Sequence, residues 1–109
     1  MTPEDYRAMI AGQMSESDLQ NKVIDTALRN RWMYYHTYNS RRSVPGFLDL
    51  VLVHEDHGVM WRELKKQNGR VSVDQNKWID RLTAAGQNVG VWRPSDWVSG
   101  QIVKELMGQ

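Results

Sequence analysis

The strongest constraint on the fold is a predicted β-hairpin that carries acidic residues among apolar ones. One strand is expected over residues 46–53 (GFLDLVLV) and the next over 59–65 (VMWRELK), with a polar turn between them. Asp49 and Glu63 are equidistant from Asp56, so an odd-numbered loop centred on Asp56 sets the two carboxylates opposite each other. Because directly paired residues share one face of a sheet, the two acids are expected to meet.

Lys65 joins this pair, because residues two apart in a strand point to the same face. Two carboxylates buried side by side are costly unless a positive charge neutralises them, and a hard divalent cation held by oxygen ligands commonly does so. Such an ion activates a bound water and stabilises charge on a phosphodiester, while a nearby lysine orients the nucleophile or the phosphate. The hairpin therefore predicts a metal-dependent hydrolytic site. The alternative is an ordinary ion pair between Glu63 and Lys65, with Asp49 capping a turn.

Several short motifs around these residues occur in the order typical of one nuclease family. Asp49, thirteen residues and then Glu63-Leu64-Lys65 resemble the PD-(D/E)XK nuclease signature, and the surrounding sequence resembles its VRR-NUC branch, including small phage-type members. The family usually has proline before its first acid, where Leu48 stands here, a difference that concerns the start of the strand rather than the chemistry. The matching segments are residues 15–20, 35–37, 40–49, 63–65, 69–75, 86 and 91–94.

The resemblance implies a restriction-endonuclease-like fold and a Mg²⁺- or Mn²⁺-dependent DNA endonuclease. Small members of the family imply a homodimer that cuts branched or Holliday-junction DNA. The implied metal ligands are Asp49, Glu63, Glu16 and the backbone carbonyl of Leu64, and the implied catalytic residues are Asp49, Glu63, Lys65, Gln75 and Glu16. Judged by position alone, Glu16 and Gln75 are equally well explained as residues in the first turn of a helix that cap its N-terminus.

Basic residues flank the acidic site on both sides in the sequence. Residues 22–42 hold five Lys or Arg and one acid, and residues 62–70 hold four, Arg62 among them, and one acid. This pattern suits a phosphate backbone, although solvated helix and loop faces give similar runs. The candidate DNA-binding residues are Arg41, Arg42, Lys66 and Arg70.

The remaining patterns predict an α/β fold with the element order α-β-β-β-α-β-α. A strand, a helix and a further strand in succession usually give parallel neighbours, so we expect a mixed sheet flanked by helices. Two Ser-led capping boxes mark helix starts. The expected elements are helices at about 15–31 and 73–85, an aromatic strand over 32–38, the hairpin, a strand over 89–93 and a terminal helix from Ser95 through Leu106.

The length of 109 residues fits one domain over 1–109, in which residues 1–13 form either a short helix or an N-terminal extension. The chain has no cysteine, and no apolar run approaches the roughly 20 residues needed to cross a bilayer. The first residues lack a signal-peptide pattern. We therefore expect a cytoplasmic protein without a membrane partner.

Two alternatives to an enzyme remain open on the sequence. One is a catalytically silent nucleic-acid-binding module with a nuclease-like fold, and the other is a protein-interaction domain with an incidental ion pair. The run His54-Glu55-Asp56-His57 resembles a metal cluster. Four adjacent residues at a hairpin tip cannot easily converge on one ion, so a solvent-exposed turn is the better interpretation.

Overall fold

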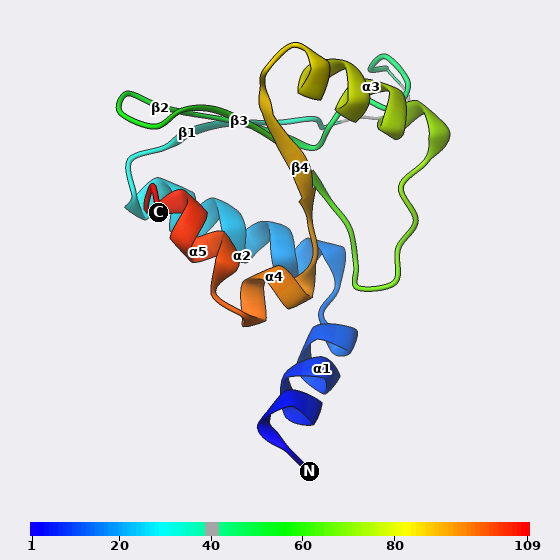
Figure 1. The fold of residues 1–109 in the computed structure, drawn as a ribbon, viewed down its shortest axis with the longest axis vertical. Helices are drawn as coiled ribbons and strands as arrows, with labels where there is room; N and C mark the ends of the chain where they lie inside the picture. The colour runs from blue at the N-terminus through cyan, green and yellow to red at the C-terminus, as the bar shows by residue number, and fades with distance from the viewer. Residues whose placement is uncertain (39–41) are drawn as a thin grey trace.

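A four-stranded mixed sheet forms the centre of the molecule (Figure 1). The computed structural model describes residues 1–38 and 42–109. The strands are antiparallel except for the last pair, which is parallel, and this arrangement confirms the predicted mixed sheet. Their order across the sheet is β1 (Met33–His36), β2 (Leu50–His54), β3 (Gly58–Leu64) and β4 (Asn88–Trp92).

Helices cover both faces of this sheet, as predicted (Figure 1). Helices α2 (Glu16–Arg29), α4 (Pro94–Val98) and α5 (Gln101–Leu106) lie on one face, and α3 (Val73–Ala84) lies on the other. The first residues form a helix, α1 (Pro3–Gln13), which extends away from the sheet and contacts α4. Within the described ranges, 1–38 and 42–109, no helix is long and apolar enough to span a membrane.

The hairpin register agrees with the prediction from Asp56. Leu50 pairs with Arg62 and His54 pairs with Gly58, which leaves a three-residue turn over 55–57. One further step in this register sets Asp49 opposite Glu63, just beyond the regular ladder. The even-numbered residues of β2 and β3 then point toward α2 and α5, and the odd-numbered ones point to the other face.

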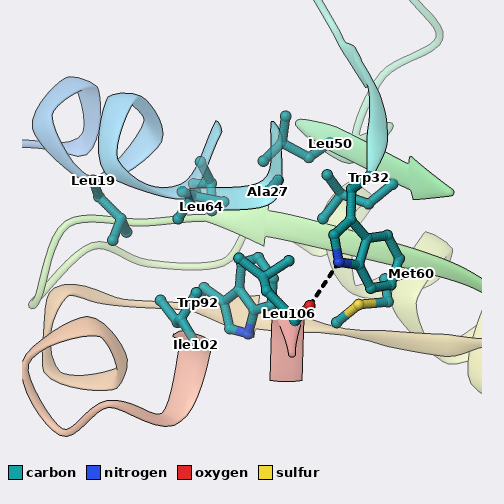
Figure 2. Packing of buried hydrophobic residues seen from close by; sticks show 11 residues of the cluster. Leu19, Ala27, Trp32, Leu50, Met60, Leu64, Trp92, Ile102 and Leu106 are labelled. Carbon is teal, nitrogen blue, oxygen red and sulfur yellow. Dashed lines mark hydrogen bonds between the residues drawn. The ribbon is translucent and has the colours of Figure 1, made fainter. Parts of the chain in front are cut away.

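The main core lies between the sheet and the layer of α2 and α5 (Figure 2). The indole nitrogen of Trp32 donates a hydrogen bond of 2.8 Å to the carbonyl of Leu106, which joins the start of β1 to the end of α5. Burying this many aliphatic and aromatic side chains supplies the main favourable term in folding. The buried cluster includes Leu19, Val23, Leu50, Leu52, Met60, Leu64, Trp92 and Ile102.

A smaller aromatic cluster positions α3 on the opposite face. The Phe47 ring meets Trp78 and Trp61 edge-on, with centroids 5.0 Å and 6.3 Å apart. Gly46 has a φ of +82° and packs against the backbone of Asp74, so a side chain there would clash. The segment before Asp49 is thereby packed against the first turn of α3.

Both predicted capping boxes are present. Ser15 Oγ accepts from the backbone N–H of Asp18 at 3.0 Å, and the Asp18 carboxylate accepts from that of Ser15 at 3.2 Å. Ser72 and Gln75 make the same reciprocal pair at 3.1 Å and 2.9 Å. These caps begin α2 and α3 at the expected residues.

The prediction of one terminal helix from Ser95 was wrong. Pro94 begins α4, because its fixed φ and missing N–H suit the first helical position. Gly100 then adopts a left-handed φ of +84° and separates α4 from α5. Two short helices therefore replace the single predicted one.

Two polar residues of the hairpin are buried, contrary to expectation. Arg62 is an even-numbered residue of β3, so its guanidinium enters the core face, where it pairs with Glu105 at 3.0 Å and lies 4.9 Å from the Trp92 ring. It is therefore removed from the basic surface. His54 is only 7% exposed and stacks on His57, so the prediction of an exposed turn holds for residues 55–57 and fails for His54.

We predict that Glu105→Leu lowers the free energy of unfolding by on the order of 3 kcal/mol, because the buried Arg62 guanidinium loses its counter-ion. The double variant Arg62→Met/Glu105→Leu should regain much of that loss. Urea denaturation followed by circular dichroism measures both. Asp25→Ala, which breaks the exposed pair with Arg29, serves as control and should change stability by less than about 0.5 kcal/mol. Equal losses in the single and double variants would contradict the prediction.

Candidate metal centre

Three carboxylates from separate elements meet beyond the regular pairing of β2 and β3. Asp49 immediately precedes β2, Glu63 is the penultimate residue of β3, and Glu16 is the first residue of α2. One oxygen atom of each lies within 4.8 Å of the others. Glu63 is 2% exposed, Asp49 is half-buried and Glu16 is exposed. The site is therefore an acidic cluster that is buried at Glu63 and open to solvent at Glu16.

Reciprocal hydrogen bonds hold Asp49 and Glu63 together. The Asp49 carboxylate accepts from the backbone N–H of Leu64 at 2.8 Å, and the Glu63 carboxylate accepts from the backbone N–H of Asp49 at 3.2 Å. On the other side, Thr37 N–H donates to the carbonyl of Asp49 at 2.9 Å. The two acids thus continue the hairpin with side-chain hydrogen bonds, and this fixes their mutual orientation.

Lys65 and Gln75 contact the same oxygen of Glu63. Lys65 Nζ lies 3.3 Å from Glu63 Oε2, and Gln75 Nε2 donates to that atom at 2.7 Å. Gln75 also accepts from the backbone N–H of Ser72 through its carbonyl oxygen. The cap and the contact to the site are therefore both made by one side chain, where the sequence presented them as alternatives.

The carboxylates of this cluster repel one another. Burial, together with the charge of Asp49, raises the pKa of Glu63 from 4.5 to about 7, and Lys65 opposes this rise only in part. Burial and the charge of Asp49 also raise the pKa of Glu16, which Lys65 and Lys66 counteract. Lys65 is the one ammonium group paired with an acid of this cluster in the described residues, so further positive charge at this point stabilises the ionised site.

The donor set fits a hard divalent cation. Carboxylate oxygens are the ligands that Mg²⁺ and Mn²⁺ prefer, and two ligands of one Mg²⁺ lie no more than about 4.2 Å apart. Closing the observed separation of up to 4.8 Å requires movements of less than about 1 Å. Exposed Glu16 is free to make that adjustment. The Leu64 side chain lies in the core, and its carbonyl remains a predicted ligand only.

Three of the four candidate DNA-binding residues lie on loops that adjoin β2 or β3. Lys66 and Arg70 are exposed on the loop between β3 and α3, directly after Lys65. Arg42 is exposed on the loop before β2, and Arg41 lies outside the described residues. Their contacts with DNA remain predictions.

Arg93 is a residue whose role the sequence did not indicate. Its Nη1 lies within hydrogen-bonding distance of three carbonyls of the loop after Lys65: 2.7 Å from Gly69, 3.1 Å from Lys66 and 3.2 Å from Gln67. These contacts hold the basic loop against the junction of β4 and α4. Because they span 24 to 27 residues, no local pattern reveals them.

Comparisons with known proteins agree with this geometry. The family model described as the VRR-NUC domain matches residues 3–96. A solved structure described as a VRR-NUC domain is similar with a TM-score of 0.67 and 20% sequence identity, covering 82% of this chain and 96% of that one. At this identity the similarity concerns the fold. Among curated proteins, none gives a significant match.

We predict that the metal-free protein loses stability as the pH rises from 5 to 8. The pKa of Glu63 is about 7 when folded and 4.5 ordinarily, so no penalty exists below pH 4.5, and the loss is complete above pH 7. In chelator, the free energy of unfolding of the natural protein should fall over this pH range by roughly 3 kcal/mol more than that of Glu63→Gln. At pH 8, Mg²⁺ should restore stability to the natural protein and not to the variant. Parallel pH profiles of the two proteins in urea denaturation would refute this.

Proposed function

Because the chain belongs to the VRR-NUC family, we propose that it is a metal-dependent DNA endonuclease. Family membership makes it a nuclease-like domain with DNA as its partner. The finer proposal is that Mg²⁺ or Mn²⁺ supports hydrolysis of phosphodiester bonds in branched or Holliday-junction DNA. The observation that carries it is the set of three carboxylate oxygens within 4.8 Å of one another, beside Lys65.

Each residue of the site has a separate task in this proposal. Asp49, Glu63 and Glu16 hold the ion, and the carbonyl of Leu64 adds a ligand. When bound, the ion lowers the pKa of a water and stabilises the charge that develops on the phosphate. Lys65 donates hydrogen bonds to the nucleophile or to a phosphate oxygen. Gln75 holds Glu63 through its amide, so that the carboxylate keeps one orientation.

Exposed cations then orient the DNA around the site. Lys66 and Arg70 extend from the loop that Arg93 fixes, and Arg42 approaches from the loop before β2. Their positive charge attracts the phosphate backbone and makes binding salt-dependent. We include Arg41 with this group on the sequence alone.

A catalytically silent binding module explains the site less well. Three clustered carboxylates repel the phosphates that such a module must hold, and their mutual repulsion costs folding free energy. A binding function gains nothing in return. The cluster is explained when it serves hydrolysis.

We also propose that the protein acts as a homodimer. Met33, Val53 and Val59 form a row across β1, β2 and β3 on the face opposite α2, and they are 75%, 45% and 36% exposed. Tyr35 lies on the same face and is also exposed. An apolar patch of this kind favours a self-complementary interface, and a second copy supplies the second active site that symmetric cutting of a junction requires.

The proposed chemistry predicts that Asp49→Asn and Lys65→Met each lower the cleavage rate by at least about 100-fold and leave the fold intact. Purified protein is incubated with plasmid, single-stranded and four-way-junction DNA in Mg²⁺, in Mn²⁺ or in chelator. Cleavage should require metal, and DNA binding should persist in both variants. Asp80→Asn and Lys77→Met change exposed residues of α3 and are the matched controls. Binding without cleavage under every metal would instead establish the silent module.

The proposed homodimer predicts that charged residues in the apolar patch separate the two copies. Met33→Glu/Val53→Glu should halve the mass measured by sedimentation equilibrium, because two charges enter the apolar patch, while circular dichroism stays unchanged. Glu4→Gln on α1 is the control, since it changes an exposed charge elsewhere. A natural protein that already sediments as a monomer at micromolar concentration would exclude this interface.

A further inference from the structure

A groove between α2 and β1 has no part in the site described above. Its volume is about 510 Å³, within the range of roughly 300–1,000 Å³ typical of ligand sites. Tyr34 and His36 pair with Leu52 and Leu50, so their side chains lie on the face of the sheet that α2 covers. The groove is lined by Gln20, Asn21 and Ile24 from the helix, by Tyr34, Tyr35 and His36 from the strand, and by Tyr38 after it.

One end of this groove lies near the acidic cluster, although no acid of the cluster lines it. Gln20 follows Glu16 by four residues, so both lie on the same side of α2. At the other wall, Thr37 bonds the carbonyls of Asp49 and Leu48 at 2.9 Å and 2.7 Å, which places the end of β1 beside the first acid. The groove therefore lies one helical turn from Glu16 and next to a residue that bonds the Asp49 backbone.

The lining suits nucleobases. Tyr34 and Tyr38 are 42% and 94% exposed, although aromatic side chains of this size usually have a packing partner. The His36 and Tyr38 rings lie 6.3 Å apart at 69°. The amides of Gln20 and Asn21 can donate and accept, and the described residues of the lining include no carboxylate to repel a phosphate. Aromatic stacking faces are typical of sites for unpaired nucleotides, because every base has a π-face.

We propose that this groove binds unpaired bases of the DNA strand that adjoins the cleaved phosphate. The distance along β1 from the level of Asp49 to Tyr34 is roughly 10 Å, enough for about three bases at 3.4 Å spacing. Tyr34 and Tyr38 supply stacking faces, and Gln20 and Asn21 contact base edges. The inference rests on the proposed nuclease function and adds that the substrate has a single-stranded segment beside the cut.

The test measures DNA binding in chelator, where no cleavage occurs, so its result is independent of whether the protein proves to be a nuclease. The protein is titrated into a labelled oligothymidylate of about six nucleotides, and its affinity is measured by fluorescence anisotropy. The same measurement is made with an abasic strand of equal length and with a blunt duplex. The natural protein should bind the oligothymidylate at least about tenfold more tightly than the abasic strand. Tyr34→Ala/Tyr38→Ala should abolish this difference and leave duplex binding unchanged.

Three controls separate stacking from folding and charge. Tyr34→Phe/Tyr38→Phe keeps the ring faces and should retain the preference for bases. Tyr38→Ala alone removes a side chain that is 94% exposed, so its loss of preference cannot come from unfolding. Tyr6→Ala changes an exposed tyrosine of α1 and should have no effect.

Equal affinity of the natural protein for the oligothymidylate and the abasic strand would overturn the proposal. An undiminished preference for bases in the double alanine variant would also overturn it. If that variant in addition shows a drop in sedimenting mass, the groove is assigned to contact between copies of the chain.

Discussion

The pair of hydrogen bonds between the Asp49 and Glu63 segments determines the rest of the site. Each carboxylate accepts from the backbone of the opposite segment, at 2.8 Å and 3.2 Å, at the point where the hairpin ladder ends. Backbone donors there require acceptors, and the acids provide them. The same bonds hold two like charges together, so the site requires positive charge nearby, and Lys65 supplies one such charge.

Helix starts complete the arrangement from both faces of the sheet. The Ser15 box begins α2 with Glu16 directed at the cluster, and the Ser72 box begins α3 with Gln75 against Glu63. In each case a local capping signal also places a side chain at the site. The aromatic cluster around Phe47 then holds α3 against the segment that leads to Asp49. The two caps, the main core that holds α2 and the small aromatic cluster that holds α3 together bring groups from four separate parts of the chain to the site.

The sequence allowed the local features to be predicted, and it did not allow the long-range ones. The hairpin register, both capping boxes and the order of elements follow from spacing and turn chemistry, and the structure confirms them. Burial of Arg62 depends on Glu105, 43 residues away, and the Arg93 contacts depend on a loop 24 residues away. His54 was misjudged because it belongs to the strand by register, although its neighbours form a turn. The burial and the contacts of such residues depend on partners that are distant in the sequence.

Burial of Glu63 makes ion uptake at this site an exchange of cations. Its pKa of about 7 leaves a proton on the carboxyl over part of the neutral range, and a divalent ion bound at the proposed site would displace that proton. Apparent affinity for the ion therefore rises with pH, and the heat measured in calorimetry depends on the ionisation enthalpy of the buffer. The buried acid at the end of the hairpin ladder would thus link metal binding at the proposed site to pH.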